Sequence, residues 1–262
     1  MTVTAIPTVF ADPRRVAPKF RPFRAFGHFR ALIADKEDTE QVFHIFECLP
    51  RKGFVSDARA FCDSEAGQRL MREELYLPAI LDDHATLKQL PAGTVGRAYV
   101  DFMENEGLSA AGLVAEAAKM GRPRYDDQMQ WYTDRLRDTH DMLHVLTGYG
   151  RDALGEQCVL AFTYGQNRNL GNFFIAYLGG LELKKSVKAG APVFAALRQG
   201  QRHGTAAPTI HCESILSLLS EPLADARRRL NIGDPTEYRA CHSAYRGRGI
   251  DPYNFLAQPQ TA

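Results

Sequence analysis

The chain has 262 residues, 45% of them hydrophobic and 24% charged, which is typical of a globular protein with a sizeable core. Its net charge of +1 argues against a protein that binds nucleic acid through a general basic field. The cysteines are scattered without a C-x-x-C pair, which argues against a disulfide framework or a cysteine-rich zinc site.

The first segment, residues 1–22, contains four prolines and no clear hydrophobic period, and it predicts a flexible N-terminal arm. No basic region precedes an apolar run, so no signal peptide is predicted. No window approaches the roughly 20 apolar residues of a membrane-spanning helix. The nearest, residues 170–183, is shorter and contains three glycines and a glutamate. We therefore expect a cytoplasmic protein without a signal peptide or transmembrane helix.

Helical periodicity dominates from about residue 23, with apolar residues recurring every three or four positions. Thr94 and Ser109 suit helix N-caps, and Pro50 and Pro91 suit helix ends. The predicted helices cover residues 35–49, 63–77, 81–90, 94–106, 109–121, 126–147, 152 through the 160s, 170–186, 192–201 and 211–230. Strand patterns are nearly absent. The prediction is an all-α fold: a single domain over residues 23–262, with roughly eight to ten helices and an irregular tail from residue 245.

The predicted helix over 126–147 carries two histidines near its end. His140 continues a buried apolar face, and His144 follows one turn later. Side chains at positions i and i+4 project together, so two imidazoles at this spacing can bind one metal ion. Asp141 lies about 100° around the helix, where it can bind the metal or orient a histidine. Glu156 follows a glycine-containing break that lets the next helix turn back toward the pair.

Two imidazoles with one or two carboxylates suit zinc, iron or manganese and leave the open coordination positions that catalysis needs. The alternative is a pair of hydrogen-bonded core histidines. Asp141 stands where the zinc-protease motif H-E-x-x-H has its glutamate, which excludes that motif. The doublet of His140 and Asp141 also fits helical metal phosphohydrolases. These need an upstream histidine and a downstream aspartate, for which His84 and Asp225 are candidates.

The spacing H-D-x-x-H, eleven residues and then E resembles the coenzyme Q biosynthesis protein 4 family. The residues that match it are His140, Asp141, His144 and Glu156. The stretches "LPAGTVGRAYVDFM" (90–103) and "ILSLLSEPLADARRRLNI" (215–232) resemble the same family, as does the segment around the motif helix. The resemblance covers about residues 25–232. "IHCESI" (210–215) departs from the aromatic-acidic pair that the family has there.

The resemblance implies an all-helical protein of ubiquinone synthesis with a divalent metal, zinc first and iron or manganese as alternatives. Because no targeting sequence is predicted, we expect a bacterial member of the family. The four matching residues would be its metal ligands and catalytic residues. The implied activity is that of a decarboxylase of the lyase type. It would replace the carboxyl at ring carbon C1 of a polyprenylated hydroxybenzoate with a hydroxyl. The alternative is a non-catalytic, prenyl-lipid-binding scaffold that organises other ubiquinone biosynthesis enzymes. The implied location is peripheral, at the inner membrane, and a homodimer is a candidate assembly.

Such a substrate needs an apolar groove for its tail and a cation for its carboxylate. Phe173, Phe174 and Tyr177 lie in an apolar segment that predicts either a groove wall or a buried core helix. Arg97 and Arg151 are candidates for the carboxylate, because a guanidinium group can bind it through two hydrogen bonds. Two further arginines, Arg135 and Arg168, share this prediction.

Overall fold

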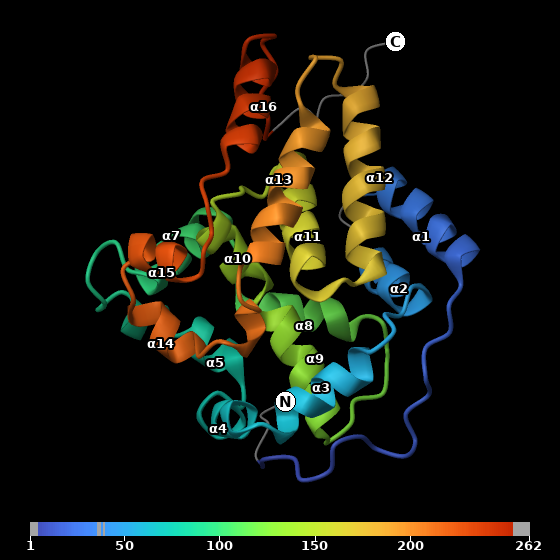
Figure 1. Cartoon of the computed structure of the whole chain (residues 1–262), viewed down its shortest axis with the longest axis vertical. Helices are drawn as coiled ribbons and strands as arrows, with labels where there is room; N and C mark the ends of the chain where they lie inside the picture. The colour runs from blue at the N-terminus through green and yellow to red at the C-terminus, as the bar shows by residue number, and fades with distance from the viewer. Residues whose placement is uncertain (1–4, 36–37, 39, 254–262) are drawn as a thin grey trace. The chain divides into compact units, whose positions relative to one another are not determined.

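The computed structural model describes residues 5–35, 38 and 40–253, and the regular structure of these residues is helical, without strands (Figure 1). The all-α class is therefore confirmed, with shorter and more numerous helices than predicted. In chain order they are α1 (Pro22–Ala34), α2 (Glu40–Cys48), α3 (Phe54–Asp63), α4 (Glu65–Glu73), α5 (Leu77–Leu81), α6 (His84–Leu87), α7 (Val95–Asn105), α8 (Ala110–Ala118), α9 (Gln128–Asp138), α10 (His140–Thr147), α11 (Ala153–Asn167), α12 (Leu170–Ser186), α13 (Val193–Ala206), the 3-10 helix η1 (Ile210–Cys212), α14 (Ile215–Ser220), α15 (Leu223–Arg229) and α16 (Thr236–Arg246).

The backbone divides into two compact units. Unit 1 comprises Met1–Met142 with Thr209–Ala226, and unit 2 comprises Leu143–Pro208 with Arg227–Ala262. The division falls inside α10, which is one continuous helix. The domain boundary between residues 22 and 23 stays a prediction. None of the described helices is long and apolar enough to cross a bilayer.

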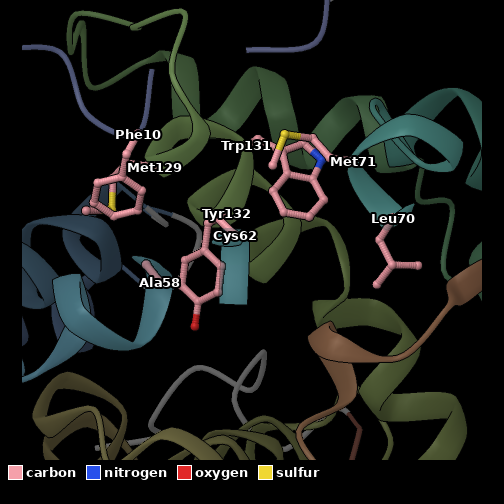
Figure 2. Close-up of a cluster of buried hydrophobic side chains, with 8 residues drawn as sticks. All are labelled: Phe10, Ala58, Cys62, Leu70, Met71, Met129, Trp131 and Tyr132. Atoms are coloured by element: carbon pink, nitrogen blue, oxygen red, sulfur yellow. The ribbon is translucent and has the colours of Figure 1, made fainter. Parts of the chain in front are cut away.

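A cluster of buried apolar side chains from α3, α4, α9 and the segment before α1 forms a core of unit 1 (Figure 2). On each helix the buried residues lie within four positions of one another, so that one face of the helix is buried. Burying a large apolar side chain contributes about 1.5–3 kcal/mol each. The cluster consists of Phe10, Ala58, Cys62, Leu70, Met71, Met129, Trp131 and Tyr132.

Part of the predicted N-terminal arm is docked onto this core. The backbone carbonyls of Val9 and Phe10 accept hydrogen bonds from the first turn of α9, at 3.0 and 2.9 Å. Arg15 donates to both carboxylate oxygens of Asp127 at 2.6 Å each. The ring of Phe10 is buried in the cluster. The arm's flexibility stays a prediction, and residues 1–4 lie outside the described part of the chain.

Unit 2 is built around α11, α12 and α13, which lie side by side, with α16 packed on α11 and α13 (Figure 1). Glycines let α11 and α13 approach closely. A Cβ added at Gly204 would lie 1.9 Å from the carbonyl oxygen of Phe162, and one added at Gly165 would lie 2.3 Å from that of Gln201. Backbone therefore packs directly against backbone, which only glycine permits.

Three of the predicted helices are interrupted, and the helix predicted over 192–201 continues to Ala206. The helix over 126–147 is two helices, because Thr139 leaves the helical path and its hydroxyl bonds back to the carbonyl of Arg135 at 2.9 Å. The helix over 63–77 ends at Glu73, and the next begins at Leu77 with a proline in its first turn. The segment 211–230 is divided into η1, α14 and α15, since Ser214 caps a new helix.

Helices α1, α3 and α16 are not among the predicted ones. The predicted irregular tail begins inside the last turn of α16, and its residues 254–262 lie outside the described part. The two predicted N-caps are confirmed: Thr94 accepts a hydrogen bond from the backbone of α7 and Ser109 from that of α8. Asp152 caps α11 in the same way.

Candidate metal centre

Helix α10 begins at His140, directly after the break at Thr139, and carries three of the four predicted ligands. One potential ligand atom from each of His140, Asp141 and His144 lies within 4.8 Å of the others. Asp141 and His144 are buried, and His140 is half-buried. Because one helix carries all three, their spacing follows from helix geometry. In the described part of the chain, this is the one such group of three or more potential ligands.

The imidazole of His144 is oriented by a backbone carbonyl. Its Nδ1 lies 3.0 Å from the carbonyl oxygen of Tyr149, which can only accept, so Nδ1 carries the proton. Gly148 ends α10 with a φ of +75°, a left-handed conformation that turns the chain and brings this carbonyl back. The proton on Nδ1 leaves the lone pair on Nε2, as in histidines that bind metals.

Glu156 meets His144 from the next helix. Its Oε2 lies 3.6 Å from Nε2 of His144, too far for a good hydrogen bond and close enough for both atoms to face one cation. Arg151 lies on the other side, with its Nε 3.5 Å from Oε1 of Glu156. Glu156 is not part of the tighter group on α10. The donor set of imidazole nitrogens and carboxylates nevertheless fits zinc, iron or manganese.

A buried network fixes the start of α11, and with it Glu156 one turn later. Asp152 accepts hydrogen bonds from the backbone of Leu154 at 3.1 Å and Gly155 at 3.3 Å. Its carboxylate also accepts from the hydroxyl of Tyr238 and lies 3.2 Å from Nε2 of His242, both on α16. Burial and the Asp152 carboxylate raise the pKa of Tyr238 far above its usual range, so the hydroxyl stays protonated and can donate.

The two residues on α16 were not predicted as part of this site. Tyr238 and His242 lie one turn apart on a helix that no sequence signal marked, more than 80 positions from Asp152. Their one trace in the sequence is the i, i+4 spacing of an aromatic residue and a histidine.

A sequence model of the family described as "Coenzyme Q (ubiquinone) biosynthesis protein Coq4" matches residues 52–236, which is more than half of the chain and a range that contains the four predicted ligands. The chain belongs to the Coq4 family. This confirms the resemblance that rests on the spacing of the ligand motif.

Curated relatives of this chain are mitochondrial Coq4 proteins. It is 31% identical over 148 residues to "Ubiquinone biosynthesis protein COQ4 homolog, mitochondrial" of Drosophila ananassae, covering 56% of this chain and 54% of the relative. It is 30% identical over 98 residues to the COQ4 protein of Yarrowia lipolytica, covering 37% and 36%. The matched regions thus span about half of these relatives' length, or less.

A solved structure shares the fold. The crystal structure of a putative ubiquinone biosynthesis protein from Nostoc punctiforme PCC 73102 superposes with a TM-score of 0.59. It covers 82% of this chain and 100% of that one, at 19% sequence identity. At this identity the likeness shows the fold alone.

The four arginines predicted for the substrate carboxylate have different surroundings in this Coq4 family member. Arg135 is buried, bound to Glu74 at 2.8 Å and to two backbone carbonyls near η1, so its contacts lie in the interior of unit 1. Arg97 donates to a carbonyl at the end of α6, and Arg168 lies over an aromatic ring at the end of α11. Arg151 alone of the four contacts a predicted ligand.

The predicted tail-binding residues lie on α12, in a row of aromatic rings. The centroid of Phe173 lies 5.0 Å from that of Tyr164 on α11 and 4.6 Å from that of Tyr177. Tyr177 donates a hydrogen bond to Gln201 at 2.7 Å. Phe173 is 41% exposed and Phe174 is half-buried. The helix is thus neither wholly core nor wholly exposed, because its glycines face α11 and α13 while this aromatic row reaches the surface.

The phosphohydrolase alternative finds no further ligand in the described part of the chain. His84 lies 3.3 Å from Glu104 on α7, and neither His84 nor Asp225 belongs to the group on α10. The doublet of His140 and Asp141 therefore lacks the two additional ligands that this class of enzyme requires.

Proposed function

We propose that this Coq4 family member is a metal-dependent enzyme of ubiquinone synthesis that acts at ring carbon C1 of a polyprenylated hydroxybenzoate. The reaction would be an oxidative decarboxylation that replaces the carboxyl with a hydroxyl. One observation carries the proposal: Nε2 of His144, with the proton on Nδ1, faces the Glu156 carboxylate, and His140 and Asp141 precede His144 by about one turn on the same helix. Family membership supports the pathway.

The four ligands would hold the cation and leave positions open to the substrate. A divalent cation supplies a positive charge that polarises a bound oxygen and stabilises the charge that develops as CO2 leaves. The net change is a two-electron oxidation, with one oxygen entering the ring and CO2 leaving. Dioxygen is the class of oxidant that the reaction requires. If water supplies the ring oxygen, dioxygen takes up the two electrons and leaves as hydrogen peroxide. If dioxygen supplies the ring oxygen, its second atom leaves as water after taking two electrons from an external donor and two protons.

Arg151 is suited to hold the substrate carboxylate next to the ligands. Its side chain is 38% exposed and its Nε lies 3.5 Å from Oε1 of Glu156, which places a guanidinium group beside a predicted ligand. A substrate bound in this way would have its reacting carbon close to the open positions. Fixing that geometry is a large part of what an active site contributes to rate.

The aromatic row on α12 would hold the isoprenoid tail. Phe173, Phe174 and Tyr177 present apolar area at the surface of unit 2, the unit that also contains Arg151 and Glu156. A branched hydrocarbon chain gains from burial against aromatic faces. A groove for such a lipid, and a peripheral contact with the membrane that supplies it, belong to this proposal.

The experiment is turnover of a short-tailed prenyl-hydroxybenzoate by protein loaded with zinc, iron or manganese. We expect the hydroquinone product and CO2 from the wild type with at least one metal. His144→Ala should lower the rate by about 10²-fold or more while keeping the helical signal, and His84→Ala serves as the matched control. Absence of turnover with all three metals would contradict the proposal.

One observation favours the scaffold alternative. His144 is only 2% exposed and Asp141 9%, and structural metal ions are commonly enclosed by their ligands in this way. A scaffold of this kind would bind a prenyl lipid and other ubiquinone biosynthesis enzymes without turnover. Cooperative unfolding on chelation, together with no product under any condition above, would support it over catalysis.

A further inference from the structure

Helix α1 exposes a stripe of aromatic and aliphatic side chains. Phe23 is 93% exposed, Phe26 50% and Ile33 36%. Together with Arg30, their positions are spaced by three or four residues, so they lie on one face of the helix. Phe20, just before the helix, is 61% exposed. An apolar stripe of this kind in water is costly and marks a surface that another phase or molecule covers.

The opposite face of α1 is packed and holds the helix in place. Ala25 and Phe29 are buried, and α1 packs along α2. The rings of His28 and His44 stack at 4.7 Å between the two helices. Because α2 holds one face, the exposed stripe is presented outward by unit 1 itself.

The same segment concentrates positive charge. Residues 13–34 contain five arginines, one lysine and no acidic residue, in a chain whose net charge is only +1. Arg14 and Arg15 are bound to aspartates. The other four cations are exposed, and none of them has an ion pair within the described part of the chain: Lys19, Arg21, Arg24 and Arg30.

Apolar rings interleaved with cations at helical spacing fit an anionic lipid surface in particular. Phenylalanines can enter the boundary between headgroups and acyl chains, while basic side chains on the flanks bind lipid phosphates. Arg30 lies within the stripe, and its long side chain can reach up to the headgroups from there. A dry protein interface, by contrast, usually excludes unpaired charges from its centre.

We propose that residues 16–33 form a docking surface for an anionic phospholipid bilayer, with Phe20, Phe23 and Phe26 inserted and the four exposed cations on lipid phosphates. The surface lies outside residues 52–236, the part that matches the Coq4 family. The inference rests on the proposed function only for the expectation of membrane contact, and it names the surface and the lipid class.

The test is co-sedimentation of the full chain with vesicles of phosphatidylcholine, with or without phosphatidylglycerol. We expect binding to the phosphatidylglycerol vesicles that weakens with added salt. Phe23→Ser with Phe26→Ser should reduce partitioning about tenfold, and Arg24→Glu with Arg30→Glu should abolish the preference for anionic vesicles. Phe23→Trp should show a blue-shifted emission on binding, since the single native tryptophan, Trp131, is already buried.

Matched controls lie on the same unit. Val55 and Leu216 are also exposed apolar residues, at 56% and 43%, and their change to serine should leave binding unchanged. So should Lys52→Glu with Arg72→Glu. Full binding by both α1 variants would overturn the proposal. It would also be overturned if Phe23→Ser with Phe26→Ser dissolved an oligomer in light scattering, because the occupant would then be a second copy of the chain.

The docking proposal and the proposed enzymatic function can be tested independently of each other. Phe23→Ser with Phe26→Ser should keep the metal content and the turnover of a short-tailed substrate in solution, because α1 contributes no predicted ligand. Loss of vesicle binding with intact turnover would confirm that docking and chemistry use different surfaces. Vesicle binding that persists in His144→Ala would likewise show that membrane docking does not depend on the metal centre.

Discussion

At His144 a single hydrogen bond decides which nitrogen can bind a metal ion. The Tyr149 carbonyl oxygen accepts a hydrogen bond from Nδ1–H, with 3.0 Å between the oxygen and Nδ1, and the position of this carbonyl depends on the positive φ of Gly148. The motif spacing predicted the ligands because residues 140, 141 and 144 are neighbours on any helix. It could not predict the carbonyl, since a backbone atom leaves no signature in the sequence.

His211 makes a second prediction at the scale of one residue. It is buried beside Arg135 and hydrogen-bonded to Tyr132 at 3.0 Å, and burial lowers its pKa to about 3. In the unfolded chain its pKa returns to about 6.5. Between these values the unfolded chain binds the extra proton, so stability falls as the pH falls, with a slope approaching ~1.4 kcal/mol per pH unit.

Urea denaturation between pH 7 and pH 4 checks this prediction. Glutamine can keep a hydrogen bond to Tyr132 but does not titrate, so His211→Gln should show a shallower loss of stability in acid than the wild type. Parallel pH profiles for the two proteins would mean that His211 is not the group responsible.

At the scale of elements, Asp152 joins two helices. It caps α11 and accepts from Tyr238 on α16, so Asp152→Ala removes a cap and leaves buried polar atoms without their partner. We expect a loss of about 2–4 kcal/mol in the free energy of unfolding. Ser109→Ala, which removes the exposed cap of α8, should cost about 1 kcal/mol. Equal losses for the two variants in urea denaturation would show that the α16 contacts add nothing.

The packing of α11 on α13 gives a matched pair of glycine substitutions. Gly204→Ala would place a Cβ 1.9 Å from the carbonyl of Phe162 and should destabilise the protein by several kcal/mol, about 3 or more. Gly27 lies in α1 with nothing within 4 Å of an added Cβ, so Gly27→Ala should stabilise by up to about 1 kcal/mol. Thermal unfolding would reveal the opposite signs, and two shifts in the same direction would contradict this view of the packing.

The helices differ in how far their sequence determines their limits. The range of α12 was predicted to the residue, because Asn169 caps its start and apolar spacing continues to its basic end. The break inside the predicted helix over 126–147 could not be seen in the sequence, because threonine is acceptable within a helix. It is the hydrogen bond of the Thr139 hydroxyl to a backbone carbonyl that competes with the regular helical backbone there. Helix α16 was missed because contacts with α11 and α13, more than its own apolar pattern, bury its aromatic face.

For the whole molecule, composition and periodicity predicted the fold class and argued against two kinds of protein. The all-α class is confirmed, and none of the described helices could span a membrane. The argument from net charge against polyanion binding stays a prediction. The geometry of the site could not be predicted from composition and periodicity, because the approach of Glu156 to His144 depends on the turn at Gly148 and on the cap at Asp152. Sequence spacing indicated that approach, but the network that fixes it comes from tertiary packing.

The most direct test of the metal centre is the metal content of the purified full chain, measured by elemental analysis after removal of loosely bound ions. We predict one zinc, iron or manganese ion per chain. We predict its loss in His144→Ala and in Glu156→Gln, and its retention in His84→Ala. Wild-type protein that binds none of these ions when they are supplied, or a His144→Ala variant that keeps a full equivalent, would contradict the account.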